Sequence, residues 1–149
     1  MPIEIRFLQP GDEAQLEHLA ADVFDDPLVP AAAAAFLGDA RHHLAVAVDQ
    51  GQVVGFVSAV HYLHPDKPRP EFWINEVGVA PSHQARGIGK ALLHAVLERA
   101  RGLGCAEAWV LTERGNVPAQ RLYQALGGEE APDEIVMFNF RLDAGPAGA

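Results

Sequence analysis

The sequence is short of cysteine, of basic residues and of long apolar runs, and each shortage excludes a class of protein. A single cysteine, Cys105, cannot form an internal disulfide framework, which is typical of a chain that folds in a reducing compartment. Lysine and arginine number 11 against 20 aspartates and glutamates, so the net charge is −9. That charge argues against nucleic acid or an anionic membrane as a partner and favours a cationic small molecule.

No apolar run is long enough to cross a bilayer, and the first residues lack the basic and apolar regions of a secretion signal. We therefore expect a cytoplasmic protein. No spacing of histidine, cysteine and acidic residues indicates a metal site. The 149 residues suffice for one well-buried core but not for two, so we predict a single domain over residues 1–142 and a disordered tail over 143–149.

The distribution of apolar residues and of turn residues predicts a series of strands and helices along the chain. Short apolar or alternating runs predict strands over residues 3–7, 44–48, 53–60, 72–79, 106–111 and 135–142. Helical spacing and end signals predict helices over residues 12–23, 30–37, 88–101 and 118–126. Residues 61–70 contain three prolines and are predicted to form an extended loop.

The most informative stretch is a strand, a glycine-bearing turn and an amphipathic helix over residues 71–101. Gly87 and Gly89 in the turn let a ligand approach the backbone, and the first N–H groups of the helix carry partial positive charge. Arg86 and Lys90 add charge, so the turn is predicted to bind a pyrophosphate. The glycines would equally suit an ordinary strand–helix connection, and this alternative stays open.

Two motifs resemble those of the GCN5-related N-acetyltransferase (GNAT) superfamily. Residues 84–89 match its turn motif Gln/Arg-x-x-Gly-x-Gly/Ala, and Asn116, Ala119, Tyr123 and Gly127 match N-x-x-A-x-x-x-Y-x-x-x-G. The resemblance runs through nearly the whole chain. It implies one α/β (α+β) domain, with a mixed, mostly antiparallel sheet that is splayed at its fourth strand and flanked by about four helices. It also implies acetyl-CoA as co-substrate.

The resemblance places the cofactor on three segments. Backbone groups of Val77 and Val79 would pair with the pantetheine arm as a substitute strand, and Gly78 between them would form a bulge. Asn116 would bind the same arm, or would only cap the helix that begins near Pro118. The residues expected to bind the cofactor are therefore Val77, Gly78, Val79, Gln84, Ala85, Arg86, Gly87, Ile88, Gly89, Lys90, Asn116, Ala119 and Tyr123.

Acetyl transfer to an amine needs a group that takes a proton from the ammonium and one that protonates the leaving thiolate. We predict Glu76 as the base, with a pKa raised by burial in its strand, or as an ionic anchor for the ammonium. Tyr123 is the predicted acid, because a phenol is still protonated at neutral pH. A packing role remains its alternative. His61 and His64 are alternative bases.

Within the superfamily, residues 53–55, 75–79 and 137–140 resemble the GNAT-fold aminoglycoside 3-N-acetyltransferases. This implies an aminoglycoside antibiotic as acceptor, acetylated on its 3-amino group, and hence a role in antibiotic resistance. Two acidic segments would meet at the mouth of the site, or would simply be solvated loops. The residues expected to bind the acceptor are Asp25, Asp26, Asn75, Glu76, Glu129, Glu130, Asp133 and Glu134.

Two further readings of the sequence stay open. The acceptor could be another amine, such as a polyamine, an amino acid or a protein N-terminus. The chain could also be a non-catalytic acyl-CoA-binding sensor, although a sensor would need neither Glu76 nor Tyr123. A homodimer is possible through apolar edge strands.

Overall fold

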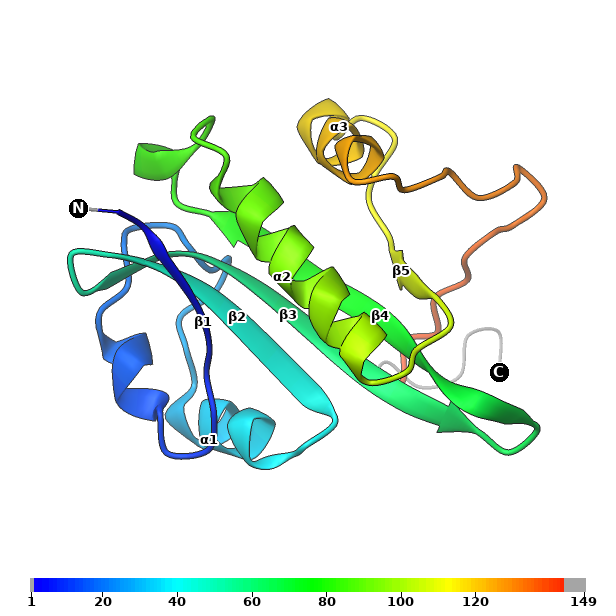
Figure 1. The fold of residues 1–149 in the computed structure, drawn as a ribbon, viewed down its shortest axis with the longest axis horizontal. Coiled ribbons are helices and arrows are strands. Elements are labelled where there is room, and N and C mark those ends of the chain that lie inside the picture. Colours follow the sequence, from blue (N-terminus) through cyan, green and yellow to red (C-terminus); the bar gives the residue numbers. More distant parts are fainter. Residues whose placement is uncertain (1, 144–149) are drawn as a thin grey trace.

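A computed structural model of the chain describes residues 2–143, and Figure 1 shows its arrangement. One five-stranded sheet has the strand order β1-β2-β3-β4-β5. The first four strands pair antiparallel, and β5 joins β4 in parallel. The strands are β1 (Glu4–Phe7), β2 (His42–Asp49), β3 (Gln52–His64), β4 (Lys67–Val79) and β5 (Ala108–Val110). The mixed, mostly antiparallel α/β sheet expected from the sequence is confirmed.

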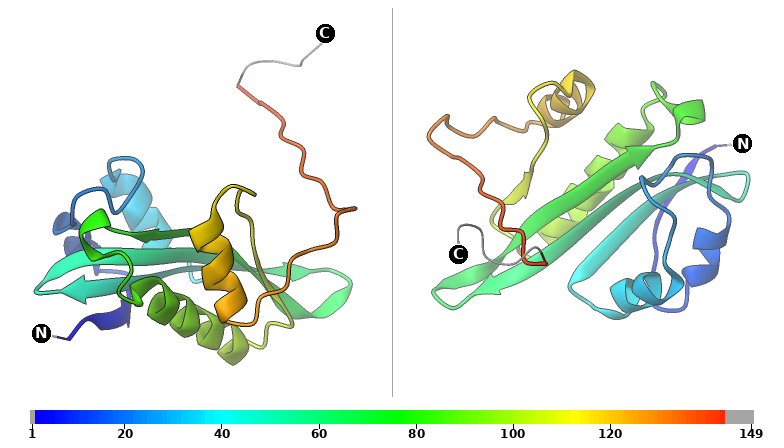
Figure 2. Two further views of the ribbon diagram at one scale, coloured as in Figure 1. Left: turned by 90° about the horizontal axis from the view of Figure 1, so that it is seen from above. Right: turned by 180° about the vertical axis from the view of Figure 1, so that it is seen from behind.

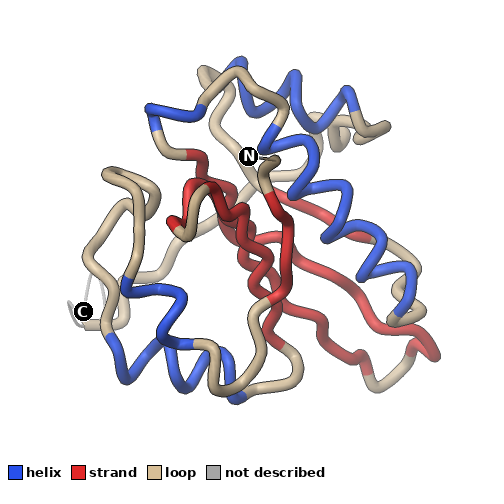
Figure 3. Tube along the Cα trace, turned by 60° about the vertical axis from the view of Figure 1, so that its left-hand side comes forward, coloured by secondary structure: helices blue, strands red, loops and turns tan. Residues whose placement is uncertain are grey.

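Helices cover both faces of this sheet. Figures 2 and 3 show α2 across one face and both α1 and the first 3-10 turn on the other. The described residues form three α-helices and two 3-10 turns rather than about four helices. The helices are α1 (Pro30–Gly38), α2 (Ile88–Gly102) and α3 (Val117–Ala125), and the 3-10 turns are η1 (Glu13–Glu17) and η2 (Pro81–His83).

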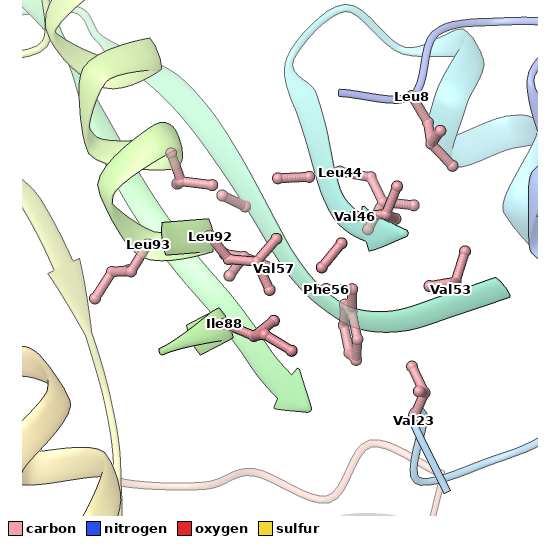
Figure 4. Close-up of a cluster of buried hydrophobic side chains, with 14 of the residues drawn as sticks. Leu8, Val23, Leu44, Val46, Val53, Phe56, Val57, Ile88, Leu92 and Leu93 are labelled. Carbon is pink, nitrogen blue, oxygen red and sulfur yellow. The ribbon is translucent and has the colours of Figure 1, made fainter. Parts of the chain in front are cut away.

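The core lies on both faces of the central strands, under α2 on one face and under the segments before β2 on the other (Figure 4). The apolar stripe predicted for α2 faces the sheet, and its members Ile88, Leu92, Leu93, Val96 and Ala100 are buried. Burying one such Leu or Val side chain contributes about 1.5–3 kcal/mol. This stripe therefore fixes the start of α2 against the end of β4, where the site is built.

The loop predicted over residues 61–70 is wrong, because this stretch is the end of β3 and the start of β4. Tyr62 pairs with Glu71 across the hairpin. The Phe72 N–H donates to the Glu107 carbonyl, so the even-numbered residues of this part of β4 direct their backbone groups away from β3. Pro68 and Pro70 occupy these even positions, where a missing N–H costs no β3 hydrogen bond.

The helix predicted over residues 12–23 is also wrong. Its apolar residues are buried as expected, but only Glu13–Glu17 is helical, as a 3-10 turn. Beyond it the chain runs beside the start of β3, where Val53 N–H donates to the His18 carbonyl and Ala20 N–H donates to the Val53 carbonyl. These backbone hydrogen bonds replace the helical ones.

The strand predicted over residues 135–142 is absent. Residues 127–143 form neither helix nor strand, and their side chains are exposed. Figure 2 shows this segment leaving the sheet beyond α3, so its alternating pattern finds no backbone partner. The predicted tail lies, apart from Asp143, outside the described residues.

Candidate active site

The sheet opens between β4 and β5, as the predicted splay requires. Only Phe72–Ile74 of β4 pair with Ala108–Val110, and Figure 1 shows the chain after β5 turning away towards α3. The register of β4 against β3 shifts by one residue at Asn75, between the pairs Ser58–Glu76 and Ala59–Ile74. The bulge is therefore at Asn75, and the prediction of a bulge at Gly78 is wrong.

Gly78 has a different role, which is close packing. A Cβ at this position would lie 2.6 Å from the Phe56 ring and 2.7 Å from the Val23 carbonyl oxygen. Glycine is needed here so that the loop between η1 and α1 can approach the strand. The Phe24 ring stacks on Phe56 with 4.0 Å between centroids, which fastens this loop beside the end of β4.

The open edge of β4 presents the backbone groups of Val77 and Val79. The Ala80 N–H donates to the Val54 carbonyl of β3. Because backbone groups alternate in direction along a strand, those of Gly78 also point towards β3, and those of Val77 and Val79 point towards the opening. Gln84 Nε2 donates to the Val79 carbonyl at 3.2 Å, so the turn is tied to the strand end. An extended ligand could use the remaining groups as a substitute strand, which stays a prediction.

The turn before α2 has the geometry of an anion site. Gly87 is the N-cap of α2 in a left-handed conformation, with φ 79°, and no side chain caps the helix. A Cβ on Gly87 would meet nothing within 4 Å, so the space before the free N–H groups is open. Arg86 and Lys90 are exposed beside it. A shallow hollow continues along α2, lined by Gly87, Lys90, Ala91, His94 and Leu126.

A hydrogen-bonded clamp that was not predicted holds the chain just before this turn. His83 Nε2 donates to Asp49 Oδ2 at 2.8 Å, and Ser82 Oγ donates to His83 Nδ1 at 2.7 Å. The clamp ties η2 to the end of β2. Asp49 lies 34 residues from His83, so no local sequence signal could have paired them.

In the second motif, Asn116 is the N-cap of α3, and Ala119 and Tyr123 lie on the helix. Asn116 Oδ1 accepts a hydrogen bond from the Ala119 N–H at 3.2 Å, so the capping role foreseen for it is observed. Tyr123 is half-buried, and burial raises the pKa of its phenol. The described residues offer its hydroxyl no hydrogen bond. Gly89 lies next to α3, since a Cβ at this position would be in van der Waals contact with Leu122.

Glu76 lies on the face of the sheet that α2 does not cover. A Cβ on Gly55 would meet Leu92 and Ile88 of α2, whereas Gly78 faces the opposite loop. Glu76 is two residues before Gly78 and shares its face. Its side chain is exposed, so the expected burial in the strand is wrong. Asn75 beside it is exposed too.

The two acidic segments expected to form one mouth lie apart. Figure 1 shows the loop between η1 and α1 on the β1–β2 side and the chain after α3 beyond β5. Asp25 and Asp26 follow Phe24 and are therefore near the end of β4, on the Glu76 face. Glu130 instead forms an ion pair with Arg114. The remaining exposed acids of that segment are Glu129, Asp133 and Glu134.

The two histidines considered as alternative bases are engaged elsewhere. His61 Nδ1 lies 2.8 Å from His43 Nε2, and this pair faces α2 rather than Glu76. His43 itself is buried. His64 Nε2 lies 3.0 Å from Glu71 Oε2 near the tip of the β3–β4 hairpin. Neither ring stands beside Glu76.

Two kinds of feature are absent from residues 2–143. No helix in this range is both long and apolar enough to cross a membrane. No three histidine, cysteine or acidic side chains in this range gather around a common point as metal ligands would.

Comparison with known proteins gives the same assignment as the motifs. The model of the Acetyltransferase (GNAT) family matches residues 9–127. The chain is 34% identical over 128 residues to N-alpha-acetyltransferase RimI of Mycobacterium tuberculosis, covering 85% of this chain and 78% of that protein. It is 33% identical over 97 residues to N-acetyltransferase family 8 member 2 of Rattus norvegicus, covering 65% of this chain but only 43% of that protein.

Among solved structures, the fold matches that of an aminoglycoside acetyltransferase, HMB0005, from an uncultured soil metagenomic sample. The TM-score is 0.81 at 24% identity, and the match covers 95% of this chain and 99% of the other. Acetyltransferases of this family take the acetyl group from acetyl-CoA, and the uncapped start of α2, its two cations and the open β4 edge fit that donor. The chain therefore belongs to the GNAT acetyltransferase family, as an enzyme that uses acetyl-CoA.

Proposed function

We propose that this enzyme acetylates a primary amine of a cationic small molecule and that the acceptor is an aminoglycoside. The observation that carries the proposal is the opening between β4 and β5, which leaves the end of β4 unpaired on that side, before the uncapped start of α2. We assign the anion site to the start of α2, the acceptor to the exposed Glu76 and the general acid to Tyr123 on α3.

We assign the donor site to the turn and the open strand edge. Bound acetyl-CoA would supply an activated acetyl thioester. The N–H groups at the start of α2, with Arg86 and Lys90, would hold its pyrophosphate, and Val77 and Val79 would pair with its pantetheine arm. Asn116 would contribute its amide nitrogen, since its oxygen already accepts the capping hydrogen bond of α3.

Tyr123 is the proposed general acid. Transfer forms a bond between the amine nitrogen and the acetyl carbon and breaks the carbon–sulfur bond, so the departing sulfur needs a proton. The raised pKa of the Tyr123 phenol keeps that proton on the hydroxyl at neutral pH. The described residues do not engage this hydroxyl, which leaves it free to donate.

Glu76 is proposed to hold the acceptor's ammonium and to accept its proton through water. An exposed carboxylate attracts a cation by charge and hydrogen bonding without the cost of a buried charge. Asp25 and Asp26 on the neighbouring loop add negative charge to the same face. The acidic chain as a whole, with net charge −9, steers cations towards it.

The likeness to RimI supports a second acceptor, a protein N-terminus. One experiment separates the two: acetyl-CoA-dependent thiol release measured with aminoglycosides, polyamines, amino acids and short peptides. Turnover of aminoglycosides but not peptides supports the proposal, and the reverse result replaces it with the second acceptor. Transfer to the 3-amino group rests on the sequence resemblance, and NMR of the acetylated product tests it.

A further inference from the structure

The Glu76 face of the sheet carries a second group of polar and aromatic side chains, at the other end of β4. Phe72 and Ile74 are buried, and Phe72 packs near His43 on the side that α2 covers. Glu71 and Trp73 alternate with them and therefore point to the opposite face. With partners from β3 and β5 they form what we call the distal cluster: Tyr62, His64, Glu71, Trp73 and Trp109.

Hydrogen bonds fix the carboxylate at the centre of the distal cluster. Trp109 Nε1 donates to the Tyr62 hydroxyl at 2.9 Å, and that hydroxyl donates to Glu71 Oε2 at 2.6 Å. His64 Nε2 lies 3.0 Å from the same oxygen, as a second donor. These donors, Tyr62 first, lower the pKa of Glu71 and so maintain its charge. The described residues offer no hydrogen bond to Oε1.

An exposed aromatic surface adjoins this carboxylate. The Trp73 and Trp109 rings stack 4.9 Å apart, with only 7° between their planes. Trp73 is 36% exposed, although a core tryptophan would be covered. A flat indole face next to a fixed carboxylate is suited to a ligand that combines a ring or methylene chain with a positive charge.

The spacing along β4 relates the distal cluster to the reacting end. Glu71 and Glu76 are five residues apart on β4, but the bulge at Asn75 adds one residue, so the two side chains share a face. Their partners on β3, Tyr62 and Ser58, are four residues apart, so at about 3.3 Å per residue the two backbone positions are separated by roughly 13 Å, and Trp73 lies between them. A ligand that reaches both carboxylates must be longer than a free amino acid or a single sugar ring.

We propose that the distal cluster is a second anchoring subsite that selects elongated polycationic acceptors. Glu71 binds a remote ammonium through Oε1, and the Trp73 face supports the intervening ring. This inference rests on the proposed function, since it requires an acceptor whose reacting amine lies at Glu76. The enzyme would then select an acceptor by the distance between two of its positive charges, and not by the reacting amine alone.

The test compares Glu71→Gln with a matched control, Asp66→Asn. Both remove one negative charge from the β3–β4 hairpin with little change of shape, but Asp66 is exposed and pairs with Lys67 outside the cluster. Tobramycin serves as the elongated polycation and glucosamine as the acceptor with a single ammonium. Trp73→Ala probes the ring platform, and thermal melts followed by circular dichroism show which variants are folded.

For Glu71→Gln we expect the tobramycin KM to rise about 10-fold to 100-fold, because one charge-assisted hydrogen bond is lost, while kcat stays within about twofold. Trp73→Ala raises the same KM. The glucosamine KM is unchanged in both variants, and Asp66→Asn changes neither acceptor. Equal KM changes for both acceptors, or none for either in a folded Glu71→Gln protein, would overturn the proposal.

Titration calorimetry with tobramycin and CoA separates this inference from the proposed function. If no amine is acetylated but Glu71→Gln still weakens tobramycin binding by about tenfold or more, the subsite exists and the proposed function is wrong. If Glu71→Gln and Asp66→Asn bind tobramycin as the unmodified protein does, the subsite is refuted whether or not turnover occurs.

Discussion

The buried histidine on β2 makes folding stability depend on pH in a predictable way. His43 is 6% exposed, and its ring lies 5.4 Å from the Phe72 ring. Arg99 Nη1 lies 3.4 Å from His43 Nδ1, and His61 Nδ1 lies 2.8 Å from His43 Nε2. Burial, and then the charges of His61 and Arg99, lower the pKa of His43 from 6.5 to about 4. The folded protein therefore holds this ring neutral.

Acidification should consequently destabilise the fold. Because the pKa of His43 is lower in the folded state, the unfolded chain binds the proton first. The stability due to the neutral ring is complete above pH 6.5 and is lost as the pH falls to about 4. This gap between the two pKa values corresponds to on the order of 3 kcal/mol, since each pH unit of difference is worth about 1.4 kcal/mol.

Urea unfolding followed by circular dichroism at pH 7 and pH 4.5 measures this loss. In His43→Gln the glutamine side chain keeps a donor and an acceptor but does not bind a proton. Between pH 7 and pH 4.5 the unfolding free energy of this variant should therefore fall by about 2 kcal/mol less than that of the unmodified protein. His18→Gln, which removes an exposed histidine, is the control and should follow the unmodified protein. Equal pH dependence in the His43→Gln variant and the unmodified protein would refute the reasoning.

Three further substitutions test the site itself. Gly78→Ala should cost about 1–3 kcal/mol in urea unfolding, because the new Cβ would lie 2.6 Å from the Phe56 ring, whereas Gly38→Ala, with open space around it, should cost far less. Asp49→Ala removes the clamp on η2 and should weaken acetyl-CoA binding in calorimetry by about tenfold; unchanged affinity would show that the clamp does not position the turn. Tyr123→Phe should lower kcat by about 100-fold or more with little loss of stability, and an unchanged kcat would exclude the acid role.

Local signals were enough to predict the turn and the helix to which we assign the donor. The stripe beginning at Ile88 predicted the buried face of α2, and the glycines before it predicted the open, uncapped turn. Both features depend on residues within one or two helical turns of each other. The fold class could be predicted because the second motif follows the first in the expected order, and its residues do form α3 with its N-cap.

The acceptor half could not be predicted in the same way, because it depends on contacts between distant strands. Three prolines indicated a loop over residues 61–70, and this hid the pairing of Tyr62 with Glu71. The burial of His43 depends on α2, since Arg99 covers it from 56 residues away. Residues 135–142 are rich in the apolar and aromatic residues that favour a strand, but composition cannot supply the neighbouring strand that would pair with them.

The central claim is that the opening between β4 and β5 is a working acetyltransferase site. The most direct test is acetyl-CoA-dependent thiol release with tobramycin, using the unmodified protein and the Glu76→Gln and Tyr123→Phe variants. We predict turnover that depends on both acetyl-CoA and amine and that falls in both variants, while acetyl-CoA binding is retained. Tight acetyl-CoA binding without turnover of tobramycin or any other amine would contradict the claim and indicate an acyl-CoA sensor.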